Sequence, residues 1–73
     1  MKANELNLGD KVDIIYMTYT NNGGMRRWLR NLQVMDFYKF SEPRFNSIVF
    51  KQLTNGKNFT ITIEDIKAIY RNK

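Results

Sequence analysis

The residues best suited to chemistry in this sequence are arginines gathered around its only tryptophan. They are Arg26, Arg27 and Arg30, with Trp28 between them. A guanidinium is a planar fork that fits phosphate oxygens, and an aromatic ring gives a surface on which bases stack. On a strand, Arg26, Trp28 and Arg30 share one face. The cluster predicts a polyanion-binding surface, unless Trp28 is core and the arginines are solvated edge charges.

Further candidates for the same surface flank this cluster. Tyr19 precedes it, Tyr38 and Lys39 follow it, and Arg44 lies in the next loop. Each adds an aromatic ring or a positive charge, which are the groups that single-stranded nucleic acid recognises. We therefore include Tyr38, Lys39 and Arg44 with the arginine cluster as candidate residues for binding nucleic acid or a protein partner.

Catalysis, cofactors and metals receive no support from the residue types. The sequence has no His and no Cys, and its seven carboxylates are scattered. Neither a nucleophile motif nor a phosphate-loop pattern occurs. Glu64 and Asp65 are adjacent, so on a strand they would point to opposite faces and could not act as an acid–base pair. We expect no enzyme activity, no cofactor and no metal site.

Length and charge limit the class of protein. The 73 residues fit one small domain spanning 1–73, whose marginal core makes self-association a reasonable expectation. Twelve Lys and Arg against seven Asp and Glu give a net charge of +5, which favours nucleic acid or an acidic protein surface but also serves solubility. With no signal peptide and no membrane span apparent, we expect a soluble cytoplasmic protein.

The elements that position the cluster are predicted to be strands. Residues 11–20 carry apolar and β-branched residues on both faces, and Asn21-Asn22-Gly23-Gly24 is a hairpin turn. Residues 25–39 then form an unusually long strand, whose face alternation breaks near Arg30-Asn31 and so predicts a bulge or kink. A helix is the rival for 25–39, because Trp28, Leu32 and Met35 have helical spacing, but the preceding turn favours a strand.

The second half of the chain predicts shorter elements. Residues 46–53 and 58–63 read as strands around a second Asn-Gly turn, 64–66 as a short 3₁₀ turn, and 67–71 as the closing strand. The loop 40–45 contains Phe40 and Phe45, which we expect to fold over the end of the sheet as a lid, the alternative being a protein-contact patch. The positively charged residues of this half are spread along the sequence, and we interpret them mainly as solvated surface charges. They are Lys51, Lys57, Lys67, Arg71 and Lys73.

This order of elements resembles that of the SH3-like and Sm-like small barrels, including the WYL-type modules of bacterial regulators. The resemblance is carried by Leu8-Gly9-Asp10-Lys11-Val12 at the start and by residues 62–69, TIEDIKAI, at the end. It implies an all-β, five-stranded SH3-like small barrel with a long bent second strand and a short 3₁₀ turn before the last strand.

Three functions remain open. The first is nucleic-acid binding without strong sequence preference, through Arg26, Arg27, Trp28 and Arg30. The second is a protein-interaction module, because in size and composition the chain resembles phage and mobile-element accessory proteins, some of which inhibit host proteins. The third is a small-ligand sensor that binds nucleotides at the same Arg-lined face.

Overall fold

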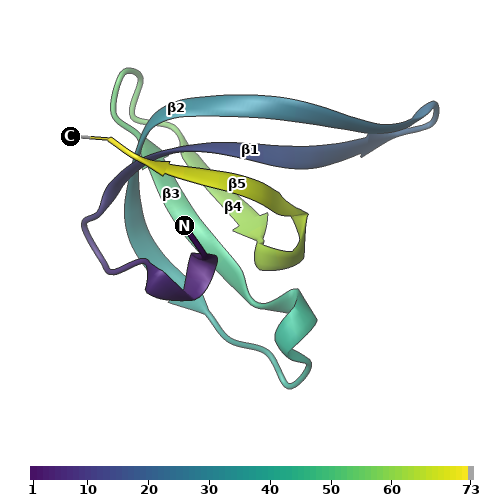
Figure 1. Cartoon of the computed structure of the whole chain (residues 1–73), viewed down its shortest axis with the longest axis horizontal. Coiled ribbons are helices and arrows are strands. Elements are labelled where there is room, and N and C mark those ends of the chain that lie inside the picture. The colour runs from purple at the N-terminus through teal and green to yellow at the C-terminus, as the bar shows by residue number, and fades with distance from the viewer. Residues whose placement is uncertain (73) are drawn as a thin grey trace.

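The computed structural model describes residues 1–72 and shows an all-β chain; Lys73 lies outside the described residues. The strands are β1 Lys11–Thr20, β2 Gly23–Tyr38, β3 Ser47–Gln52, β4 Asn58–Thr62 and β5 Ile66–Arg71. Three short 3₁₀ helices accompany them, η1 Ala3–Glu5, η2 Pro43–Phe45 and η3 Ile63–Asp65. All pairings are antiparallel in one sheet of order β4-β3-β2-β1-β5 (Figure 1).

The predicted strands are confirmed to within two residues at their ends. The main difference is the first turn, which is shorter than predicted because Gly23 and Gly24 already belong to β2 and Thr20 pairs with Gly23. Gly23 has a φ of 107°, a conformation that glycine adopts without the steric cost of a side chain. β2 has 16 residues, so the long second strand is confirmed and the helical alternative is wrong.

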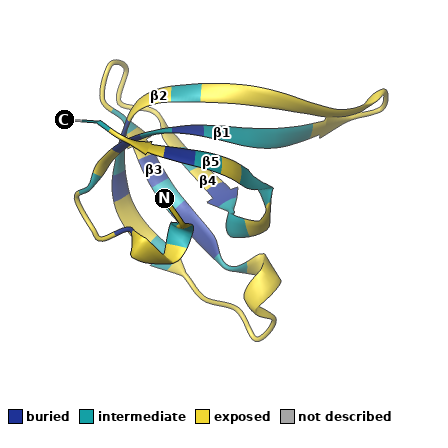
Figure 2. Cartoon of the chain, in the orientation of Figure 1, coloured by how far each residue is buried: buried dark blue, intermediate teal, exposed yellow. Residues whose placement is uncertain are grey.

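The core lies on the concave inner face of the sheet, where alternate residues of neighbouring strands meet (Figure 2). Its fully buried side chains are Val12, Ile14, Leu32, Val34, Ile48 and Phe50. Leu6, which follows η1, adds a further buried side chain to this cluster. Alternation puts Val12 and Ile14 of β1, and Ile48 and Phe50 of β3, on the face that is removed from water.

β2 contains a bulge at the predicted position. Between the pairs Ile14↔Leu29 and Val12↔Leu32, β1 advances by two residues and β2 by three. Asn31 occupies the extra space with a φ of 58°, a left-handed conformation in which asparagine is enriched among non-glycine residues. The bulge bends β2, so that its first half pairs with β1 and its second half continues alongside β3.

The sheet is curved but is not closed. β4 and β5 are its two edges, connected through η3, and no pairing joins these two strands within residues 1–72. The all-β class, the bent second strand and the 3₁₀ turn before the last strand are thus confirmed, whereas the closed SH3-like barrel is not.

One part of the sheet extends beyond the rest as a two-stranded hairpin (Figure 1). Pairing of β5 with β1 stops at Tyr16, and pairing of β3 with β2 starts at Leu32. Residues 17–26, called the arm below, therefore have no third strand on either side. A hairpin without further strands gains little from packing, so nearly all of this segment remains accessible to solvent.

Candidate functional site

A stack of aromatic and cationic side chains lies on the convex outer face at the base of the arm. The rings of Trp28 and Tyr70 are 5.6 Å apart between centroids and 19° from parallel. The Arg30 guanidinium carbon lies 4.7 Å from the centroid of the Trp28 ring, within the range of a cation–π contact. Trp28 and Tyr70 are nevertheless 49% and 51% exposed, so neither ring is buried by the other. Trp28 is a surface residue.

The strand register explains why these residues share a face. Trp28 on β2 is opposite Ile15 on β1, and Ile15 is opposite Ala68 on β5. Tyr70 lies two residues beyond Ala68 and therefore points to the same side. Arg26, two residues before Trp28, extends the face along β2. We call Arg26, Trp28, Arg30 and Tyr70 the outer patch.

The bulge fixes the backbone beneath the outer patch through a small polar network. The Asn31 backbone N–H donates to Oδ1 of Asp13 at 2.9 Å. The side-chain amide of Asn72 donates to the same Asp13 oxygen at 3.2 Å and to Oδ1 of Asn31 at 3.0 Å. These bonds connect β1, β2 and the end of β5 at one point.

The β3–β4 hairpin adds a second attachment at the same place. The Gln52 side-chain amide donates to the Arg30 carbonyl at 3.2 Å, and the Leu53 N–H donates to the Asn31 carbonyl at 2.8 Å. The backbone of Arg30 is therefore held from the side of β3 as well. The Arg30 side chain therefore extends over Trp28 from a strand whose backbone is held on both sides, and not from a loop.

The electrostatic surroundings of the outer patch are positive. No carboxylate occurs between Asp13 and Asp36 in the sequence, a stretch that contains Arg26, Arg27 and Arg30. Within residues 1–72 neither Arg26 nor Arg30 forms an ion pair. Asp13 is the carboxylate closest in register, opposite Tyr70, and its Oδ1 accepts the bonds from Asn31 and Asn72. The arginines are therefore free to meet an external anion.

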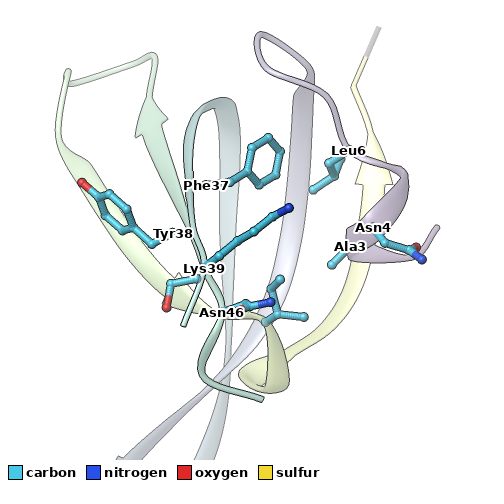
Figure 3. A pocket seen from close by; sticks show the side chains of 9 residues that line it. Ala3, Asn4, Leu6, Phe37, Tyr38, Lys39 and Asn46 are labelled. Carbon is cyan, nitrogen blue, oxygen red and sulfur yellow. The ribbon is translucent and has the colours of Figure 1, made fainter. Parts of the chain in front are cut away.

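The structure separates the remaining predicted site residues from the outer patch. Arg27 is opposite Tyr16 and so faces the inner side of the arm, away from Trp28. Tyr38 and Lys39 are at the far end of β2, beside a hollow of about 340 Å³ under η1 (Figure 3). In Figure 3 the Lys39 ammonium points into this hollow, between Phe37 and Leu6, while Tyr38 points away from it.

Arg44 also lies apart, in the loop between β2 and β3. Its Nε is 2.9 Å from a carboxylate oxygen of Glu42, and its guanidinium carbon lies 4.8 Å from the centroid of the Phe45 ring. Phe40 and Phe45 are both about half exposed, so the expectation that they fold down as a lid is wrong. The predicted residues thus form separate groups, of which only Arg26, Trp28 and Arg30 lie together on the outer face of the arm and its base.

Tyr70 is the member of the outer patch that the sequence interpretation missed. The alternation of Ala68, Ile69 and Tyr70 did place it on the face opposite the buried Ile69. What the sequence lacked was the partner of β5, because pairing with β1 rather than with β4 is what carries Tyr70 to Trp28.

Comparisons and composition add no other site. The chain matches no known family model, no characterised protein and no solved structure. Within residues 1–72 no three His, Cys, Asp or Glu side chains gather in a way that could hold a metal ion. The same residues include no helix with the length and apolar character needed to span a membrane. The functional proposal therefore depends on the outer patch itself.

Proposed function

We propose that the chain binds single-stranded nucleic acid on the outer patch, without strong sequence preference. The observation that carries this proposal is the exposed Trp28–Tyr70 stack with the Arg30 guanidinium over the indole. Aromatic rings that remain exposed on a rigid sheet are stacking platforms for bases, and every base has a face that can stack. A protein with this activity would act in the cytoplasm.

The two kinds of residue have distinct roles in this proposal. Trp28 and Tyr70 stack with unpaired bases, which duplex DNA or RNA does not offer without opening. Arg26 and Arg30 bind phosphate oxygens along the backbone, and they release counterions when they do so. Affinity should accordingly fall as the salt concentration rises, and single strands should compete better than duplexes of the same sequence.

The direct test uses the fluorescence of the single Trp28. Addition of an oligothymidylate at low salt should quench its emission, because a base stacks on the indole, and added salt should reverse the quenching. If the intensity of Trp28 emission does not change when the oligonucleotide is added at low salt, the proposal is overturned. Equal competition by a duplex would show that base stacking is not the basis of binding.

Tyr70 provides a variant with a matched control. Tyr70→Ser should weaken binding of a labelled oligothymidylate by at least about fivefold, since stacking contributes about 1–3 kcal/mol per base. Tyr38→Ser removes a ring of similar exposure at the far end of β2 and should leave affinity unchanged. Equal losses of affinity in Tyr70→Ser and Tyr38→Ser would mean that the outer patch is not the binding site.

We also infer that the sheet is an open relative of the SH3-like barrels. The support is the sheet of five antiparallel strands, the bent β2 and the η3 turn before β5, which are the features that the resemblance implies. Small barrels commonly present one face to single-stranded nucleic acid. Pairing of β4 with β5 in solution would overturn the open form and indicate a closed barrel.

The second candidate function is a protein-interaction module, and the unpaired edges of β4 and β5 favour it. An edge strand presents free backbone N–H and C=O groups that a second copy or a partner strand can pair with. This candidate predicts a dimer or larger assembly. Light scattering after gel filtration tests it, and a monomer that captures no partner would count against it.

A further inference from the structure

The outer face continues from the outer patch along the arm to a second exposed ring. Tyr19 is opposite Gly24, and Ile15 is opposite Trp28, so both rings project from the same side of the hairpin. Tyr19 is 68% exposed, more than Trp28 or Tyr70. Met17 and Arg26 are opposite each other between these two positions. Along this face the Trp28 ring is therefore followed by the Arg26 guanidinium beside Met17, and then by the Tyr19 ring.

Gly24 shapes this end of the face. A Cβ atom at Gly24 would lie 2.7 Å from Cε of Met17 and 3.4 Å from Cε1 of Tyr19. The first distance is closer than van der Waals contact permits, so the end of the Met17 side chain occupies space that the glycine leaves, while the second distance is an ordinary contact. The Tyr19 ring consequently lies against the backbone of β2, with its other side open to solvent.

We propose that the arm is part of the binding site: a single strand runs from the outer patch along the arm, and Tyr19 is a second stacking platform. This inference depends on the proposed function and adds a minimum length to the ligand. Gly24 and Trp28 are four residues apart, about 13 Å along a strand. That distance is the length of roughly four stacked bases. A dinucleotide cannot reach both platforms even when its backbone is fully extended.

The charge along this path supports a nucleic-acid strand rather than a protein segment as its occupant. Arg26 lies between the platforms and has no ion-pair partner within the described chain, and residues 14–35 include no carboxylate. A phosphate backbone crossing from Trp28 to Tyr19 would pass Arg26 without meeting a negative charge on the arm.

The test compares two ligands that differ only in length. Binding of a labelled oligothymidylate of about twelve nucleotides and of a labelled thymidine dinucleotide is measured by anisotropy. Tyr19→Ser should weaken binding of the long ligand by at least about fivefold and leave the short one within about twofold, because the short ligand occupies only the outer patch. Tyr19→Phe keeps the ring and should retain the affinity for the long ligand.

A second substitution is a control on the opposite strand. Gly24→Ala displaces only the flexible end of Met17, because the added Cβ would be in ordinary contact with Tyr19, so it should change the affinity for either ligand by less than about twofold. With Tyr19→Ser, equal losses for both ligands would mean that Tyr19 acts through the structure of the arm, and no loss for either would mean that the strand does not reach it; each result overturns the inference. If Tyr19→Ser has no effect while Tyr70→Ser weakens binding, the proposed function survives without it. If the unaltered protein does not respond to the long ligand, the proposed function itself fails.

Discussion

The two halves of β2 are parts of one strand with opposite environments. From Leu32 onward β2 pairs with β3, at Leu32 and Gln33 it pairs with β1 as well, and Leu32 and Val34 are almost completely buried. Before the bulge β2 has only β1 as a neighbour, and from Gly23 to Arg30 only Leu29 is partly buried. The change coincides with the point at which the third strand ends. Burial here is set by the number of neighbouring strands more than by the hydrophobicity of the residues, since Met25 and Trp28 are both half exposed.

This difference separates stability from the proposed function. The second half of β2 holds the packed core, so a substitution there changes the free energy of unfolding. The first half presents rings and cations to solvent, so a substitution there should change binding and leave the fold nearly intact. Experiments on the two halves should therefore give distinct results.

The largest effect is expected in the core beside the packed half of β2. Phe50→Ala on β3 removes the largest fully buried side chain, which is opposite Val34 of β2. Substitutions of this kind cost about 3–5 kcal/mol, which is most of the stability of a small domain. Urea denaturation followed by circular dichroism should show a chain largely unfolded in water. As the control from the arm, Tyr19→Ser should change the free energy of unfolding by less than about 0.5 kcal/mol; a comparable loss would show that the two halves are not separate.

A smaller effect is expected where the halves meet. Asn31→Val puts a β-branched residue at a φ of 58°, which should destabilise the fold by about 1–2 kcal/mol. Asn31→Gly keeps the backbone N–H that donates to Asp13 and loses only the side-chain bond with Asn72, so it should cost less. The two midpoints of urea denaturation compare these variants. Equal midpoints would mean that the positive φ is not what selects asparagine.

Substitution of an exposed arginine should have the smallest effect on stability, and at Arg26 it should also have a clear effect on binding. Arg26→Gln should lower the slope of log affinity against log salt by about 0.7 if it removes one phosphate contact to a single strand. Arg44→Gln makes the same change of charge in the loop after β2, where its exposed pair with Glu42 stabilises little, and it should change neither slope nor stability. Identical slopes for the two variants would mean that binding responds to net charge and not to the arm.

Much of the fold followed from local signals in the sequence. Alternation in residues 11–20 put Val12 and Ile14 on one face, although both faces carry apolar residues and only the structure shows that this one is the core; the break in alternation at Arg30-Asn31 located the bulge. Closure of the barrel could not be derived in this way, because pairing between β4 and β5 depends on the curvature of the whole sheet. The lid expected of Phe40 and Phe45 failed for a similar reason: their loop does not reach back over the core.

The candidate site was only partly accessible from the sequence. Period-two spacing was enough to place Arg26, Trp28 and Arg30 on one face and Arg27 on the other. Whether that face was core or surface required knowing that no second layer covers it. Tyr70 comes from a strand far along the chain, and only the pairing of β5 with β1 brings it to Trp28.

The bulge at Asn31 also changes which residue numbers of β2 point outward. Before it, even-numbered residues such as Trp28 point outward; after it, even-numbered residues such as Leu32 point inward. Because side chains alternate with period two, an added residue in a regular pairing would reverse the faces of everything on one side of it. The bulge prevents that reversal, since it lets Arg30 and Asn31 together occupy the space opposite one residue of β1. Deleting Asn31 would restore a regular pairing in which Leu29 is still opposite Ile14 and Trp28 still points outward. The bulge is therefore what lets the core and the outer patch coexist on a strand with this extra residue, and Trp28 emission in the deletion variant should keep the wavelength of an exposed indole.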